Sequence, residues 1–420
     1  MSDLQRSFVK AKLAALPFDP PMPQGLAEEE DEQDDLRPLP ESHDDDSSSA
    51  SSASSTGTIK PSPSKHLFAR PKGSSATKRP LDEISWTEYF DQELYLDRIT
   101  PSEKIVYHVY LTPPLQKAPL FVTHHGAGSS GLSFAVLAAA IRRALPGAGI
   151  LSLDARGHGE TVVHHTEVAA SEGSLGSGNG PNLSLPILSE DMLNVINLTQ
   201  KKMGWQELPG LILVGHSLGG AVVTEVAYKG ELKKAVLGYA VLDVVEGSAI
   251  DALQSMQSYL STRPMSFPSL SSGIEWHTRT RTIRNTTSAR VSVPSLLYQA
   301  LPSGEFYPSK APSWSWRTDL AATQPFWEGW FVGLSKKFLE AKGGKLLLLA
   351  GTDRLDKELM IGQMQGKYQL QVFPEAGHFI QEDQPEKTAM VLADFYRRND
   401  QSALVLPPKV GDILKNRQLH

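Results

Sequence analysis

The sequence predicts an α/β fold with a mostly parallel, doubly wound sheet and a helical or irregular insertion that forms a lid. Two observations support this fold class. From about residue 105 to residue 398, short apolar segments alternate with segments of helical periodicity. Several apolar segments are continuous runs, which is typical of parallel strands covered on both faces. Right-handed crossovers would then place functional side chains at the carboxyl ends of the strands.

The individual elements follow from these patterns in chain order. Strands are expected at Ile105–Leu111, Leu120–His124, Gly149–Leu153, Leu211–Val214, Ala235–Leu242, Lys345–Ala350 and Gln369–Phe373. Helices are expected at Leu132–Ala144, Ser189–Met203, Gly220–Tyr228, Phe326–Ala341 and Glu386–Arg398.

Two segments interrupt this alternation. Residues 170–185 are rich in Gly, Ser and Asn, and we expect a flexible surface loop there. Residues 247–313 are rich in Ser, Thr and Arg and contain no strong strand pattern. Long insertions of this kind are often functional, so this segment is predicted to be a lid that takes part in substrate recognition.

The two ends of the chain differ from the middle. Residues 28–46 contain eleven carboxylates and one basic residue, a serine tract follows, and residues 60–79 contain six basic residues and no acidic one. Such segments bury too little apolar surface to offset chain entropy. We therefore expect a disordered tail over residues 1–80, acidic and then basic, one folded domain over residues 81–400, and a C-terminal tail over residues 401–420.

Composition excludes several classes of protein. The chain has no cysteine, which rules out disulfides, a thiol nucleophile and thiolate metal sites. Its 41 Lys and Arg against 47 Asp and Glu give a net charge of −6, so nucleic acid is not an expected partner. No apolar run approaches the roughly 20 residues that span a bilayer, and no secretory signal is evident. A cytoplasmic or nuclear location, without membrane insertion, is expected.

The segment LILVGHSLGGA, residues 211–221, carries the clearest chemical pattern. It contains a GxSxG pentapeptide that follows an apolar strand and opens a helix, which is the context of a nucleophile elbow. Gly215 and Gly219 would remove the Cβ atoms that collide with the neighbouring strand and helix. Ser217 is therefore the predicted nucleophile. A phosphate-binding turn is the alternative, but the Walker lysine and the GxGxxG spacing are missing.

A serine nucleophile needs a base, and His378 is the predicted one. It lies in a Gly-containing loop, FPEAGHFIQED at residues 373–383, between a late strand and the last helix. The histidines beside the motifs, which are His124, His125, His158 and His216, are expected to hold loops by hydrogen bonds. A metal site is not expected, because adjacent histidines point apart on a strand and no carboxylate lies at ligand spacing.

Ester hydrolysis also needs two backbone N–H groups to bind the developing oxyanion. One is expected from Leu218, which directly follows the nucleophile. The other is expected from the small-residue loop after an early strand, with Ala127 as the choice and Gly126 as the alternative.

The third member of a serine triad is an acid, and the residue pattern leaves three candidates. Asp243 ends the strand AVLGYAVL, whereas Asp353 and Asp356 follow the strand KLLLLA. Position alone would favour Asp353, since the acid of this architecture commonly follows the later strand.

A resemblance to a known family is carried by these blocks of sequence: SWTEYF at 85–90, HHGAGSSGLSFA at 124–135, LDARGHGET at 153–161, LVGHSLGGAVV at 213–223, LDVVEGSAIDALQSMQSYLSTRP at 242–264, IEWH and RNTTSARVSVP between 274 and 294, and GTDRLDKELMIGQMQGKYQLQVFPEAGHFIQED at 351–383. From Ile84 onward the chain resembles the protein phosphatase methylesterases. These enzymes remove the methyl ester from the C-terminal leucine of the protein phosphatase 2A catalytic subunit.

The resemblance implies an α/β-hydrolase fold and a catalytic triad of Ser217, Asp243 and His378, with Asp353 in a supporting role. It implies the C-terminal tail of the phosphatase 2A catalytic subunit as substrate and partner, and no cofactor or metal. Arg284 and Arg290 in the insertion are candidate contacts by position, and a monomer is expected. Two alternatives stay open: a general small-ester carboxylesterase or lipase, and a phosphatase-binding scaffold with secondary catalysis.

Overall fold

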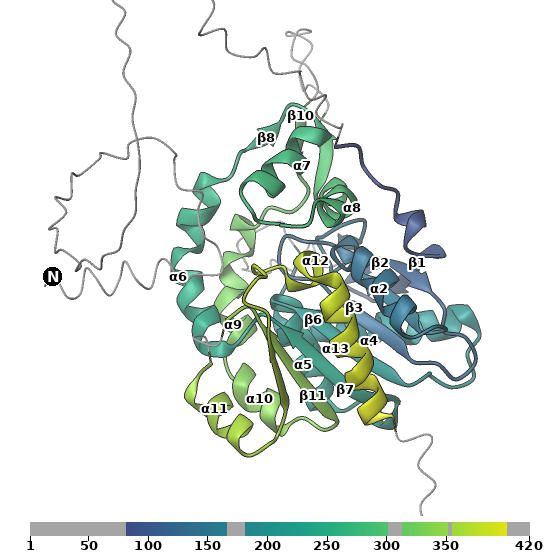
Figure 1. Ribbon diagram of the computed structural model, residues 1–420. Coiled ribbons are helices and arrows are strands. Elements are labelled where there is room, and N and C mark those ends of the chain that lie inside the picture. Colours follow the sequence, from purple (N-terminus) through teal and green to yellow (C-terminus); the bar gives the residue numbers. More distant parts are fainter. Residues whose placement is uncertain (1–80, 166–180, 301–312, 352–354, 401–420) are drawn as a thin grey trace, which may run out of the picture. The chain divides into compact units, whose positions relative to one another are not determined.

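The computed structural model describes residues 81–165, 181–300, 313–351 and 355–400 (Figure 1). The predicted tails at 1–80 and 401–420, the main part of the predicted loop at 170–185, and Asp353 lie outside these ranges. The last residues of that loop, from residue 181 onward, lie within the described ranges. Leu183, just before helix α4 (Leu185–Met203), is buried, and its carbonyl accepts a hydrogen bond from Trp330 Nε1 at 2.7 Å.

A large sheet forms the centre of the described domain. Its strand order is β1-β2-β4-β3-β6-β7-β11-β12, and β5 also pairs with β2. The strands are β1 Gln92–Ile99, β2 Glu103–Thr112, β3 Leu120–His124, β4 Gly149–Leu153, β5 Val162–His165, β6 Leu211–His216, β7 Val236–Leu242, β11 Gly344–Leu349 and β12 Gln369–Val372. From β4 through β12 all neighbours are parallel, whereas β2 pairs antiparallel with β1, β4 and β5.

Helices cover both faces of this sheet. They are α2 Ala135–Ala144, α4 Leu185–Met203, α5 Leu218–Lys229, α6 Glu246–Thr262, α7 Leu270–Arg279, α8 Thr286–Leu296, α9 Trp327–Phe331, α10 Leu334–Glu340, α11 Lys357–Met364, α12 Ile380–Asp383 and α13 Pro385–Asn399, with short 3₁₀ helices at Trp86–Glu88, Gly131–Phe134, Lys233–Ala235 and Ala321–Phe326.

Strand β6 shows why the apolar runs are continuous. Leu211 and Leu213 belong to the core under α4, α5 and α10, whereas Ile212 and Val214 belong to the core under α2 and α13. Because alternate side chains enter two different cores, every position of the strand is apolar. Figure 1 shows α13 crossing one face of the central strands.

Several elements differ from the sequence prediction, and helix α11 is among those that were not predicted. Strands β1 and β5 pair with β2 at the antiparallel side of the sheet. Neither was predicted, because β1 buries only alternate residues and β5 is only four residues long. The single helix expected at Phe326–Ala341 is divided into α9 and α10. The break is at Gly333, whose φ of 78° is left-handed and cannot continue a helix.

The segment 247–313 forms helices α6, α7 and α8 and part of a second, small sheet. Strands β8 Ser266–Phe267, β10 Ser313–Trp316 and β9 Leu297–Ala300 make up this sheet in that order. It has a core of its own around Phe267, Ile274 and Val293. In Figure 1 it lies above the large sheet, beyond the ends of the central strands.

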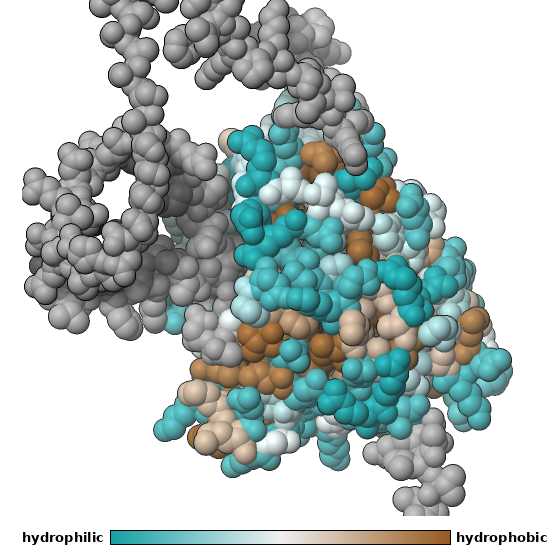
Figure 2. Space-filling view, in the orientation of Figure 1, coloured by the Kyte–Doolittle hydropathy of each residue, from teal (hydrophilic) through white to brown (hydrophobic). Residues whose placement is uncertain are grey.

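The surface is mixed in polarity (Figure 2). Met360, Ile361 and Met364 of α11 are exposed large apolar side chains, and Met364 is 88% exposed. Exposed apolar residues on one short helix are more typical of contact surfaces than scattered single residues are. Among the described residues, no helix is long and apolar enough to cross a membrane.

Candidate active site

Ser217 lies in the turn between β6 and α5. Its backbone has φ 52° and ψ −119°, a strained conformation for a residue with a Cβ atom. A Cβ at Gly215 would lie 2.0 Å from the Gly219 carbonyl oxygen, and one at Gly219 would lie 2.0 Å from the His124 carbonyl oxygen. Only glycine fits at both positions, as the sequence pattern predicts. The turn therefore presents Ser217 at the carboxyl end of the sheet and lines a cavity with it.

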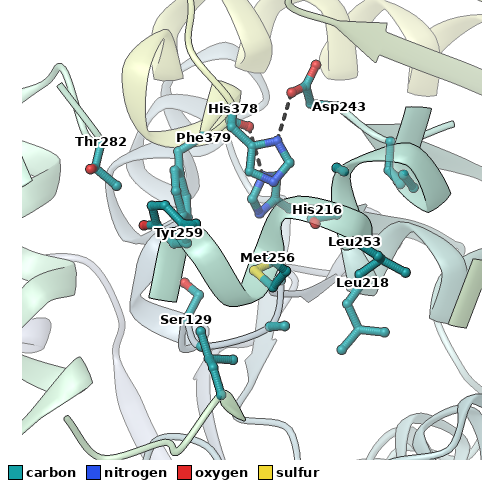
Figure 3. A pocket seen from close by; sticks show the side chains of 18 of the residues that line it. Ser129, His216, Leu218, Asp243, Leu253, Met256, Tyr259, Thr282, His378 and Phe379 are labelled. Atoms are coloured by element: carbon teal, nitrogen blue, oxygen red, sulfur yellow. Dashed lines mark hydrogen bonds and ion pairs between the residues drawn. The ribbon is translucent and has the colours of Figure 1, made fainter. Parts of the chain in front are cut away.

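His378 and Asp243 form a buried hydrogen-bonded pair. His378 Nδ1 lies 2.8 Å from Asp243 Oδ2, and the side chains are 7% and 0% exposed (Figure 3). A carboxylate oxygen accepts, so Nδ1 carries the proton and Nε2 is left as the basic nitrogen. Both side chains line the same cavity as Ser217.

Asp243 is held by the strand next to its own. Its backbone has φ 52°, and its N–H donates to the Leu348 carbonyl at 2.8 Å. The Ala350 N–H donates to Asp243 Oδ1 at 2.8 Å, while Oδ2 receives the proton of His378. Thus both carboxylate oxygens have defined partners, and the contact with Ala350 was not predictable from local sequence.

Asp356, an alternative acid in the sequence, has a different place. Its side chain caps α11, accepting a hydrogen bond from the Leu359 N–H at 2.9 Å and another from Ser335 Oγ at 2.5 Å. A carboxylate used in this way stabilises the helix N-terminus. Asp353 lies outside the described residues.

The loop after β3 contains the predicted oxyanion donors. The Gly128 N–H is used within the protein, since it donates to His158 Nε2 at 2.9 Å. Ala127 and Gly126 lie in the same loop and line the cavity, as does Leu218 at the start of α5. Within the described residues, the backbone N–H groups of Ala127, Gly126 and Leu218 make no hydrogen bond. Ala127 and Leu218 stay the predicted pair, with Gly126 as the alternative.

Four buried histidines support these loops, as the sequence suggested. His125 Nε2 accepts from the Ala155 N–H at 3.0 Å, and His158 accepts from Gly128. Burial lowers the pKa of His124 to about 4 and that of His216 to about 3, and lowers the pKa of His125 and His158 as well. These imidazoles are therefore neutral near neutral pH and act as fixed hydrogen-bonding groups.

His216 adds a contact that the sequence did not reveal. Its Nε2 donates to the carbonyl oxygen of His378 at 2.8 Å, and its ring lies against the rings of His378 and Phe379. Figure 3 shows His378 between Asp243 and His216. The residue before Ser217 thus fixes the backbone of the histidine that Asp243 orients.

The cavity around these residues is mainly apolar, and residues of the insertion form part of its lining. Helix α6 contributes Leu253 and Met256, which Figure 3 shows beside Leu218. The other large apolar side chains in its lining include Trp276, Ile283, Leu296, Trp316, Leu320, Trp327, Trp330, Phe331 and Phe379. Within the described ranges, no group of three or more His, Asp or Glu side chains is arranged to hold a metal ion.

Comparisons with known proteins decide the family. A model of the alpha/beta hydrolase family matches residues 120–391. The chain is 61% identical over 428 residues to protein phosphatase methylesterase 1 of Aspergillus oryzae, covering 98% of this chain and 93% of that protein. It is 59% identical over 450 residues to the Neurospora crassa protein of the same name, covering 99% of each. The chain belongs to the protein phosphatase methylesterase family.

The fold comparison agrees. The crystal structure of E-2-(acetamidomethylene)succinate hydrolase superposes on this esterase with a TM-score of 0.52 and 18% identity, covering 70% of this chain and 96% of that one. At this identity the likeness shows the fold alone. The predicted α/β-hydrolase fold and the predicted family are both confirmed.

Two arginines of the esterase's insertion, candidate substrate contacts by position, are used inside the chain. Arg284 Nη1 donates to the Glu375 carbonyl at 2.6 Å, and its backbone N–H donates to Asp383 Oδ1 at 2.7 Å. Arg290 Nε donates to the Asp82 carbonyl at 2.6 Å. Arg284 therefore ties the insertion to the loop that carries His378.

Glu382 is a buried carboxyl group of the esterase that the sequence analysis missed. It is 1% exposed, lines the cavity and accepts a hydrogen bond from Ser292 Oγ at 2.6 Å. Burial, reinforced by the nearby Asp383 carboxylate, raises the pKa of Glu382 from its ordinary 4.5 to about 8 despite that hydrogen bond. This side chain is therefore mostly protonated at neutral pH.

A proton held more tightly in the folded state makes stability depend on pH. The stabilisation is fully present below about pH 4.5 and is lost as the pH rises towards 8. We expect E382Q to flatten the fall in Tm across this window, since each pKa unit corresponds to about 1.4 kcal/mol, or about 2–4 °C. Thermal melts at a series of pH values measure this. An unchanged profile in E382Q would contradict the assignment.

Proposed function

We propose that this chain hydrolyses the methyl ester on the C-terminal leucine of the protein phosphatase 2A catalytic subunit, with Ser217 as nucleophile, His378 as base and Asp243 as the acid that orients His378. The observation that carries the proposal is the near-full-length similarity to protein phosphatase methylesterases in a chain whose buried His378–Asp243 pair shares a cavity with Ser217.

The proton on Nδ1 of His378 determines which nitrogen of the imidazole ring acts as the base. Asp243 holds that proton in place, so Nε2 takes the proton from Ser217 Oγ as the oxygen attacks the ester carbonyl carbon. The tetrahedral intermediate then expels methoxide, which leaves as methanol after receiving the proton from Nε2. A water molecule, deprotonated by the same nitrogen, attacks the acyl-serine and releases the leucine carboxylate with Ser217 restored.

The backbone N–H groups of Ala127 and Leu218 would bind the carbonyl oxygen as it becomes negative. They lie at the mouth of the elbow and have no partner within the described residues. Leu218 opens α5, so the positive end of the helix dipole adds to the stabilisation. Losing one such donor typically costs about 10²- to 10³-fold in turnover.

The lining of the cavity suits an apolar acyl group. Leu253 and Met256 of α6 and Trp327 of α9 lie on its wall, and burying a leucine side chain there would contribute about 1.5–3 kcal/mol. This favours a C-terminal leucine ester over a charged one. The insertion that supplies α6 is thus the proposed lid and recognition element.

The test compares kcat/KM for the methylated phosphatase catalytic subunit with kcat/KM for a short aryl ester. We expect the protein substrate to be preferred by at least about 10²-fold, because remote contacts contribute binding energy that a small ester cannot use. Methanol release and probe absorbance are the two readouts. An equal or reversed preference would favour a general carboxylesterase or lipase.

A second arm addresses the scaffold alternative. If Ser217→Ala captures the methylated subunit but releases no methanol, while the unsubstituted enzyme releases it, the subunit is a substrate that the enzyme binds and then hydrolyses. If the unsubstituted enzyme captures the subunit but leaves its methyl ester intact, the scaffold function would be the better description.

A further inference from the structure

Arg263 is a cation in the active-site cavity that the reaction does not use. It directly follows α6 and lines the cavity that holds Ser217 and His378. Its guanidinium carbon lies 3.7 Å from the ring centroid of Trp316, which is the distance of a stacked cation–π pair. Trp316 itself is fixed, since its Nε1 donates to the Pro264 carbonyl at 2.8 Å.

Within the described residues, Arg263 has no carboxylate partner and its side chain makes no hydrogen bond. The cavity's own acids are already engaged: Asp243 binds His378 and Ala350, and Glu382 binds Ser292. The Arg263 side chain keeps some exposed surface, yet burial is sufficient to lower its pKa. Withdrawing a cation from water without a counter-charge is costly, and stacking on one face offsets only part of that cost.

The stacked geometry leaves the edge of the guanidinium available. Because one face rests on Trp316, the N–H groups in the plane can point toward an incoming group. A guanidinium in a fixed plane matches a carboxylate through two parallel hydrogen bonds, which a lysine cannot reproduce.

We propose that Arg263 binds a carboxylate of the substrate peptide and thereby helps to select it. The inference rests on the proposed function, since it takes a peptide with an esterified C-terminus as the occupant of the cavity. The carboxylate can come from an acidic side chain upstream of the esterified residue or from the C-terminal carboxylate that hydrolysis produces.

Peptides that end in leucine methyl ester test whether Arg263 binds an acidic side chain upstream of the ester. A series would place Asp, or Asn as its neutral match, at each of the positions upstream of the ester. We expect the enzyme to prefer Asp at one position by about 10- to 100-fold in kcat/KM, in line with about 1.5–3 kcal/mol for a hydrogen bond to a charged group. R263Q should lose that preference while still hydrolysing the Asn peptide, and R263K should restore only part of it.

The second source is tested by binding rather than turnover. Calorimetry on Ser217→Ala would compare the free-acid peptide with its C-terminal carboxamide, with and without R263Q. Tighter binding of the free acid that disappears in R263Q would identify the product carboxylate as the ligand. R279Q, at an exposed arginine at the end of α7, is the matched control and should leave every ratio unchanged.

A purely structural stack gives a different result. In that case R263Q would lower kcat/KM for Asp and Asn peptides equally and would leave the free-acid to carboxamide binding ratio unchanged, which together would overturn the proposal. Failure of the unsubstituted enzyme to hydrolyse any of the methyl esters would count against the proposed function instead, and the binding comparison would still decide the role of Arg263.

Discussion

Ser217→Ala is expected to reduce hydrolysis of the methylated phosphatase by about 10⁶-fold, the loss seen when a serine nucleophile is removed from such a triad. No other side chain in the elbow can form the acyl-enzyme. His216, which precedes Ser217 in the chain, is buried, and its Nε2 is bonded to the carbonyl of His378. Single-turnover release of methanol measures the effect directly.

The same variant should keep its fold. Serine and alanine both have a Cβ atom, so the strain at φ 52° is already present in the parent. An unchanged Tm and loss of labelling by a fluorophosphonate probe are the expected controls. Turnover close to that of the parent, with the fold intact, would end the assignment of Ser217 as nucleophile.

Asp243→Asn is the second large effect, and we expect a loss of about 10⁴-fold in kcat. The amide oxygen can still accept from the Ala350 N–H, so the backbone geometry should persist. The amide NH₂ cannot accept the Nδ1 proton of His378, which favours the wrong tautomer and removes the charge that stabilises the imidazolium. A kcat profile against pH separates this from a general loss of structure, since the residual activity should rise with hydroxide concentration.

Two matched variants rank the acids. Asp356→Asn should change both stability and kcat little, because Asn caps a helix about as well as Asp does, and Asp353→Asn should also lose far less activity than Asp243→Asn. If either were more damaging to kcat than Asp243→Asn, the acid would follow the later strand, as position alone suggests.

The local pattern of apolar residues was sufficient to predict the parallel strands of the sheet. Strands β3, β4, β6, β7 and β11 are each buried on both faces, so each is a continuous apolar run visible without any partner. Strand β1, on the antiparallel side of the sheet, was missed because only alternate residues such as Leu94 and Leu96 are buried, and the residues between them are exposed. The break between α9 and α10 at Gly333 was also missed, because a glycine within a helical pattern ends the helix only when its φ is positive, and the sequence does not show φ.

The sequence by itself determined the nucleophile elbow, since two glycines, a serine and the flanking strand and helix are contiguous and leave one conformation that avoids backbone collisions. Its motifs also determined the family, which the comparisons confirm. The residue pattern left the acid open and the resemblance implied Asp243, whereas the contact between Asp243 and the histidine is visible only in the tertiary structure. His378 and Asp243 are 135 residues apart, and the order of β7 and β11 in the sheet brings them within hydrogen-bonding distance.

The tertiary structure likewise decided that Arg284 and Arg290 bind carbonyl groups of their own chain while Arg263 faces the cavity. All three are basic residues in one polar segment, and nothing in their spacing separates them. The reason is physical: a partner for a charged side chain is chosen by packing between segments remote in sequence, whereas a turn is specified by the backbone limits of adjacent residues.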